Sequence, residues 1–239
     1  MTREASLLVL VHGWGFDGGF WQPLCRHLPG VETLTLDLGF RGSPHLPEVP
    51  EGRPVIVVGH STGVLWLLHR RPFRWDGLVA INGFSRFVAG DGFPEGVPPR
   101  MVERMLSRFD RDPAAVTAEF LGRCGHGEAV GPLAPAVLRQ GLEWLLTWDE
   151  RAVLAADPRP VLALAGRADP IVPAVMAERC FVGRPMHWHE GGHLLPLTAP
   201  EWCAGHIRAV LEGTPLTQPS PPGRGGRRLF GSALEGTGS

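Results

Sequence analysis

Six short runs rich in leucine and β-branched residues recur along the chain, and most are separated by segments long enough to form a helix. The runs lie at 6–12, 31–37, 54–60, 77–83, 160–166 and 184–190. Apolar runs that alternate with helices are typical of a parallel sheet covered by helices on both faces. The pattern therefore predicts an α/β fold with a doubly wound, mostly parallel sheet of about six strands. In such sheets ligands bind at the carboxyl ends of the strands.

The interval 84–157 interrupts this alternation, because it contains no convincing strand. In "PPRMVERMLSRF" the apolar side chains fall on one helical face, and they are Met101, Val102, Met105, Leu106 and Phe109. Asp112 is a good N-cap, and Pro113 suits the first position of a second helix. A third apolar helix is expected at about 136–148. We interpret the interval as an inserted helical cap over the strand ends.

The length of the chain suits one domain of this class. At 239 residues it can fill one sizeable α/β core. We expect that core to consist of 1–83 and 158–212, with the cap between them. The last segment, 213–239, is rich in Pro, Gly and Ser without apolar periodicity, so we expect a disordered tail.

Charge and composition argue against several classes of function. The formal net charge is -1, so no global field draws the chain to nucleic acid or to an acidic membrane. No run has the length of a transmembrane helix, and the first apolar run is too short for a signal peptide. We therefore expect a cytoplasmic monomer that binds neither nucleic acid nor membrane. The cysteines lack C-x-x-C spacing and are expected to be reduced; they are Cys25, Cys124, Cys180 and Cys203.

The segment 59–63, Gly-His-Ser-Thr-Gly, stands between a β-branched run and an apolar run typical of a buried helix. A strand, then G-x-S-x-G, then a helix is the nucleophile-elbow pattern. Gly59 and Gly63 would leave room in the tight turn, while Ser61 would be held in strained backbone angles with its hydroxyl exposed. The free N–H groups at the start of the helix would favour negative charge on a substrate oxygen. The alternative interpretation is a glycine-rich turn with a helix-capping serine.

A nucleophilic serine needs a base to take its proton, and that base needs an acid partner. In α/β hydrolases both follow the serine, each on a loop after a later strand. "VLALAGRADPIVP" supplies Asp169 just after a predicted strand, and "HEGGHLLP" supplies His193 after two glycines. The chain order predicts a catalytic triad of Ser61, Asp169 and His193.

The end of the first predicted strand is expected to complete the site. There His12, Gly13, Trp14 and Gly15 form a stretch whose flexible backbone can turn an N–H toward the serine. We assign the oxyanion hole to the backbone amides of Trp14 and Thr62. For His12 we expect an orienting role rather than proton transfer.

HGWG, GHSTG, GRADPIVP and GGHLLPLTAPE, with the helical insert, resemble the α/β-hydrolase superfamily over about 7–212. Within it the chain is most similar to the pimeloyl-ACP methyl ester esterases of biotin synthesis, through HGWG with Trp21 and through Phe120 and Leu121 in the cap. The resemblance implies a serine carboxylesterase without metal or organic cofactor, acting on a methyl ester that is borne by an acyl carrier protein. It also implies a substrate pocket lined by Trp14, Ser61, Thr62, Phe120, Leu121, Gly122, Arg123, Cys124 and His193.

The chain departs from that family in two places. Only about six residues precede the first apolar run, where the family has one or two antiparallel strands, so the sheet should be shortened at that edge. Where the family has basic residues for its carrier, this chain has Ala115 and Glu119. The other candidates for carrier binding, of which the first three also fit a solvated helix face, are Arg100, Arg104, Arg108 and Arg123.

Several alternatives remain open at this level. His187 and His189 stand two apart with His193 close behind, but no carboxylate or cysteine at ligand spacing completes a zinc set, so we expect no metal. The same triad also serves thioester hydrolysis and C–C cleavage of diketones. A non-catalytic ligand receptor on the same fold is the alternative from another class.

Overall fold

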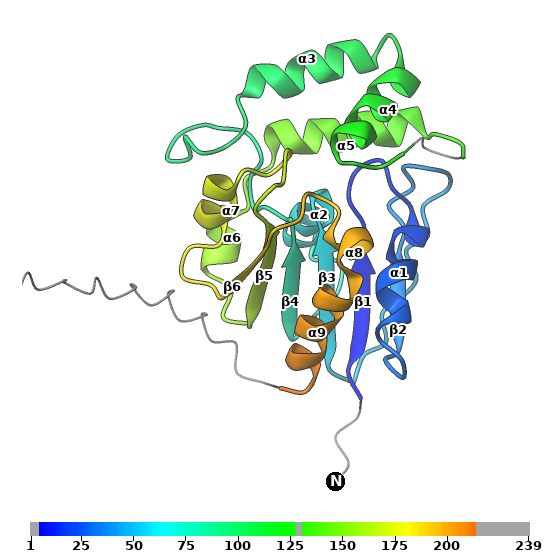
Figure 1. Cartoon of the computed structure of the whole chain (residues 1–239), viewed down its shortest axis with the longest axis vertical. Helices are drawn as coiled ribbons and strands as arrows, with labels where there is room; N and C mark the ends of the chain where they lie inside the picture. The colour runs from blue at the N-terminus through cyan, green and yellow to red at the C-terminus, as the bar shows by residue number, and fades with distance from the viewer. Residues whose placement is uncertain (1–4, 128–130, 214–239) are drawn as a thin grey trace, which may run out of the picture.

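A six-stranded sheet forms the centre of the molecule (Figure 1). The computed structural model describes residues 5–127 and 131–213. The strands are β1 (Leu7–Val11), β2 (Thr33–Leu36), β3 (Val55–His60), β4 (Gly77–Ile81), β5 (Val161–Gly166) and β6 (Met186–His189). Their order is β2-β1-β3-β4-β5-β6, and all the pairings are parallel. The predicted fold class is confirmed, and each predicted run contains one strand. Between residue 5 and β1 there is no further strand.

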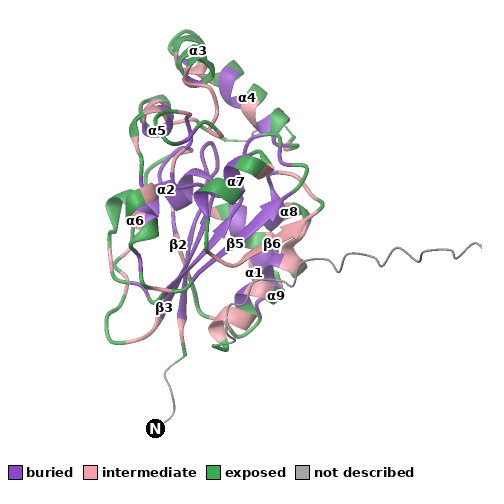
Figure 2. Ribbon diagram, turned by 90° about the vertical axis from the view of Figure 1, so that its left-hand side faces the viewer, coloured by how far each residue is buried: buried purple, intermediate pink, exposed green. Residues whose placement is uncertain are grey.

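Burial explains why the central strands read as continuous apolar runs. All residues of β1, β3, β4 and β5 are buried, whereas the edge strands β2 and β6 are partly exposed. Figure 2 shows α2 (Thr62–Arg70) on one side of the strands and α1 (Gln22–Arg26) and α9 (Pro200–Leu211) on the other. A strand covered on both faces has no polar face to alternate with an apolar one.

Three helices lie beyond the carboxyl ends of the strands (Figure 1): α3 (Pro99–Phe109), α4 (Pro113–Arg123) and α5 (Pro135–Thr147). We call these three helices the cap. Asp112 caps α4 as predicted, because its side chain accepts a hydrogen bond of 2.9 Å from the amide of Ala115. The expected apolar face of α3 is only partly buried, since Val102 and Phe109 are buried but Met101 is 48% exposed. The limits 84 and 157 for the inserted unit stay predictions.

Short elements complete the described chain. They are a 3-10 helix (Gly18–Trp21), α6 (Arg151–Ala155), α7 (Ala174–Cys180) and α8 (Leu195–Thr198). In residues 5–127 and 131–213 no helix combines the length and the apolar character that a membrane span requires. The predicted tail, 213–239, lies outside the described residues except for Gly213.

Candidate active site

Ser61 occupies the sharp turn between β3 and α2. Its backbone is left-handed, with φ 53° and ψ -123°, which is uncommon for a residue with a Cβ. Neighbouring atoms lie too close to the two flanking glycines to leave room for a side chain. A Cβ at Gly59 would lie 2.8 Å from Cγ2 of Val64, and a Cβ at Gly63 would collide with the carbonyl oxygens that end β1. The turn thus presents the serine at the carboxyl end of the sheet, as the nucleophile-elbow interpretation predicts.

His193 joins the serine to a carboxylate. Its Nε2 lies 3.0 Å from Oγ of Ser61, and its Nδ1 lies 2.8 Å from Oδ2 of Asp169. The three residues come from the turn after β3, the loop after β5 and the loop after β6, and all three are buried. The structure therefore brings the predicted acid, base and serine into one hydrogen-bonded chain.

The carboxylate of Asp169 is held from both sides. Its Oδ1 accepts hydrogen bonds from the amides of Ile171 (2.8 Å) and Val172 (2.9 Å), and its Oδ2 also accepts one from Nδ2 of Asn82 (2.7 Å). Burial raises the pKa of Asp169, but attraction and hydrogen bonding to His193 and the two amides lower it more, so the net pKa is below the usual value. The group is therefore ionised at neutral pH.

Sequence reasoning missed Asn82. Its signal was present, because it directly follows a buried apolar run and so stands at the carboxyl end of a predicted strand. Polar residues at that edge are candidates for the site in any open parallel sheet.

His60 packs against His193, with ring centroids 4.9 Å apart. Its Nε2 donates a hydrogen bond of 2.9 Å to the carbonyl oxygen of His193, and its ring stacks on Phe20 at 4.6 Å between centroids. Burial lowers the pKa of His60 to about 3, so this ring is neutral at neutral pH. The contact supports the loop that carries His193.

The two residues predicted to supply the oxyanion donors line the same cavity as Ser61. Trp14 is in the loop after β1, and Thr62 is the first residue of α2, where main-chain N–H groups have no acceptor within the helix. His12 is anchored at the base of that loop: its Nδ1 donates to the carbonyl oxygen of Gly13 (2.9 Å), and its Nε2 accepts from the amide of Leu38 (3.0 Å). The orienting role of His12 stays a prediction.

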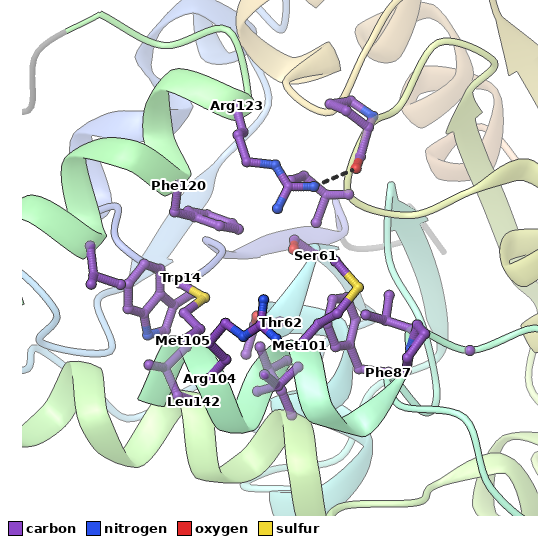
Figure 3. Close-up of a pocket in the computed structure, with 18 of the residues that line it drawn as sticks. Trp14, Ser61, Thr62, Phe87, Met101, Arg104, Met105, Phe120, Arg123 and Leu142 are labelled. Carbon is purple, nitrogen blue, oxygen red and sulfur yellow. Dashed lines mark hydrogen bonds between the residues drawn. The ribbon is translucent and has the colours of Figure 1, made fainter. Parts of the chain in front are cut away.

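A cavity of about 450 Å³ lies between the sheet and the cap, with Ser61 and Thr62 in its wall. Figure 3 shows the side chains that surround it, and most of them are apolar. The larger ones are Trp14, Phe84, Phe87, Met101, Met105, Phe120 and Leu142. A space of this size and character fits an acyl chain rather than a highly charged ligand.

Only part of the predicted pocket segment faces this cavity. Phe120 and Arg123 line it, three residues apart on α4. Leu121 and Cys124 are buried without contributing to its wall, and Gly122 is exposed, so their place in the substrate pocket stays a prediction. A helix shows one stripe of side chains to a cavity, whereas the prediction used a continuous segment. Burial also raises the pKa of the Cys124 thiol to about 12, so it is not ionised at neutral pH.

Arginines stand where the cavity wall meets the cap surface. Arg104, Arg108 and Arg123 contribute to the wall, and Arg108 forms an ion pair of 2.5 Å with Glu119. The hydrogen bond from Arg108 lowers the pKa of Glu119. Arg104 has no ion-pair partner in the described part of the chain. Arg100 is exposed and does not reach the cavity.

The histidines of β6 are occupied in ring contacts. His187 stacks on His206 with centroids 4.4 Å apart, and His189 packs against Trp202. Among the described residues no three His, Cys, Asp or Glu side chains are placed to hold a metal ion. All four cysteines are free.

No protein-family model matches the chain, but curated proteins are similar to it. It is 31% identical to the pimeloyl-[acyl-carrier protein] methyl ester esterase of Aromatoleum aromaticum, over 86% of this chain and 98% of that protein. It is 33% identical to the esterase of the same name from Legionella pneumophila, over 70% of this chain and 77% of that protein. The biotin biosynthesis bifunctional protein BioHC of Cellvibrio japonicus is 31% identical over 74% of this chain, which spans only 41% of that longer protein.

Solved structures share the fold. A hydrolase from Pseudomonas aeruginosa aligns with a TM-score of 0.71 at 21% identity, covering 88% of this chain and 91% of that one. An esterase from Exiguobacterium antarcticum aligns with a TM-score of 0.73 at 16% identity, covering 88% and 93%. The extent and identity of the match to the curated esterases place the chain: it belongs to the family of pimeloyl-[acyl-carrier protein] methyl ester esterases, within the α/β hydrolases.

Proposed function

We propose that this ester-hydrolysing enzyme is a serine carboxylesterase in which Ser61 is the nucleophile, His193 the base and Asp169 its acid partner. One observation carries the proposal: the serine hydroxyl, the imidazole and the carboxylate form an unbroken chain of 3.0 Å and 2.8 Å contacts at the wall of a largely apolar cavity. An isolated capping serine would not need such a chain.

The proposed reaction has two halves. Oγ of Ser61 attacks the ester carbonyl carbon while Nε2 of His193 takes the hydroxyl proton, and ionised Asp169 stabilises the resulting imidazolium. The amides of Trp14 and Thr62 donate hydrogen bonds to the oxyanion, each worth about 3 kcal/mol in the transition state. Collapse breaks the C–O bond and the alcohol leaves with the proton from His193. Water then attacks the acyl-enzyme with His193 again as base, which releases the acid and restores the serine.

The cavity and the relatives together suggest the substrate. The apolar wall of the cavity suits a medium-length acyl chain. The curated relatives are named for a methyl ester on an acyl carrier protein. We propose the same substrate class here. Glu119 replaces a basic residue of the family, but its ion pair with Arg108 neutralises it, and Arg104 supplies a cation at the same rim. A carrier would thus approach between α3 and α4.

The test is a kinetic screen of methyl esters of graded acyl length, free and bound to an acyl carrier protein, with matched thioesters alongside. The proposal predicts the highest kcat/KM for a medium-length methyl ester, and a further rise when the carrier is attached. Faster turnover of the thioesters would instead favour thioester hydrolysis. Binding of these ligands by folded protein without any turnover would favour a receptor.

A further inference from the structure

Asn82 is in an unusual position for a residue at the end of a buried strand. Its backbone has φ 47°, in the left-handed region, and the other described non-glycine residues there are Ser61 and Arg71. Glycine would adopt this conformation at the least cost, and asparagine is among the few other residues that tolerate it. The side chain itself is only 2% exposed. The backbone alone therefore gives no reason for a side chain at this position.

The contacts of Asn82 connect the catalytic loops. Nδ2 donates to Oδ2 of Asp169 at 2.7 Å, the same oxygen that lies 2.8 Å from Nδ1 of His193, and Nδ2 is also 3.3 Å from the carbonyl oxygen of Gly192. Its backbone N–H donates to Leu164 on β5 at 2.8 Å. One amide group thus touches both the acid and the loop of the base.

The other end of the Asn82 amide does not stabilise the fold. Its Oδ1 atom is buried and has no hydrogen-bond partner among the described residues. Such an acceptor destabilises a fold by about 1–3 kcal/mol. In this orientation of the amide, Nδ2 donates to Asp169 and lies near the carbonyl oxygen of Gly192.

We infer that Asn82 is a positioning residue of the active site, whose amide holds the Asp169 carboxylate in the plane that receives Nδ1–H of His193. This inference rests on the proposed function. It adds a fourth residue, directly after β4, the strand that lies between β3 and β5, which lead to the proposed nucleophile and acid. The amide touches no substrate and acts only through Asp169 and the loop of His193.

The kinetic test compares two glycine substitutions at left-handed positions. Asn82→Gly keeps the backbone conformation and removes only the amide, so we expect kcat to fall about tenfold or more with KM within about twofold. Arg71→Gly, at the exposed end of α2 with φ 43°, is the matched control and should retain wild-type kcat. Unchanged kcat in Asn82→Gly would overturn the inference.

A charged variant gives a second readout. The titratable groups that face His193 and Asp169 are His60 and Cys124, and the charge of Arg123 lies near Cys124. Asn82→Asp places a second carboxyl group beside Asp169, and two carboxyl groups this close share one proton, so the pH profile of kcat/KM should gain a titration that the wild type lacks. A profile of the wild-type shape would count against contact between residue 82 and Asp169.

A spectroscopic test does not depend on turnover. Asn82 is the only asparagine in the sequence, so labelling with side-chain ¹⁵N-asparagine gives one amide signal. We expect one proton of that amide to be shifted downfield by its bond to the carboxylate, and the shift to be lost in Asp169→Ala. A signal that Asp169→Ala leaves unchanged would overturn the inference. If the wild-type protein hydrolysed no ester, the proposed function would fail, and this signal would still decide the role of Asn82.

Discussion

Phe120 of the cap lies edge-on against the indole of Trp14, with ring centroids 5.0 Å apart and planes at 88° (Figure 3). Trp14 in turn donates from its indole nitrogen to the carbonyl oxygen of Leu138 on α5 at 2.8 Å. The loop proposed to stabilise the oxyanion is therefore packed against two cap helices. The wall of the cavity and the loop proposed to stabilise the oxyanion share this contact.

Phe120→Ala tests the cavity wall. An acyl chain lying against the ring would lose about 1–3 kcal/mol of binding. We expect kcat/KM for a six- or seven-carbon methyl ester to fall roughly tenfold or more, with a much smaller loss for an acetate ester. Measured side by side, an equal loss for both esters would show that the ring supports the fold or the Trp14 loop instead. Phe120→Leu keeps part of the apolar volume, so its kcat/KM for the longer ester should lie between those of the wild type and Phe120→Ala.

Arg104→Glu tests the carrier. Arg104 is exposed at the cavity rim without an ion-pair partner in the described chain, so an anionic group of a carrier-bound substrate can reach it. Reversing this charge should raise KM about fivefold or more for the carrier-bound ester and leave the free ester unchanged. Arg26→Glu makes the same charge change on α1, away from the cavity, as the control. Equal KM values for the two variants on the carrier-bound ester would exclude this docking site.

The fold could be predicted because buried strands appear in the sequence as continuous apolar runs. The apolar run of β3 and the glycines on either side of Ser61 predicted both the strand and the turn. Chain order then predicted that Asp169 and His193 lie together with Ser61, and the structure brings the three side chains into contact. The wall formed by α4 was predicted only in part, because which stripe of a helix faces a cavity depends on packing between distant elements. The position of Asn82 at a strand end could be predicted, but its contact with Asp169 could not, because the two residues are 87 positions apart in the sequence.

Gly63→Ala tests the steric basis of the elbow. The added Cβ would overlap the carbonyl oxygens at the end of β1, and neither backbone can move freely. We expect the free energy of unfolding to fall by about 3 kcal/mol. Gly205→Ala in α9 is the control, because its Cβ meets nothing within 4 Å and a helical alanine should add about 0.5–1 kcal/mol. Urea titration that ranks the two variants equally would refute the steric argument.

His60 should make stability depend on pH. Burial holds its pKa at about 3 in the folded protein, against 6.5 ordinarily. Between these values the unfolded chain binds a proton here and the folded chain does not, so stability is complete above about pH 6.5 and is lost as pH falls, by up to about 1.4 kcal/mol per unit. His60→Gln should flatten this slope, while His45→Gln at the surface should keep it. A slope that His60→Gln leaves unchanged would assign the acid sensitivity to other groups.

Active-site labelling with a fluorophosphonate tests the central claim most directly, because only a base-activated serine attacks phosphorus quickly. Intact-mass analysis of wild-type protein should show one adduct, mapped to Ser61 by peptide sequencing. Ser61→Ala should show none, and His193→Ala, which keeps the hydroxyl but removes the base, should label far more slowly. Equal labelling of the wild-type and Ser61→Ala proteins would contradict the assignment of Ser61 as the nucleophile.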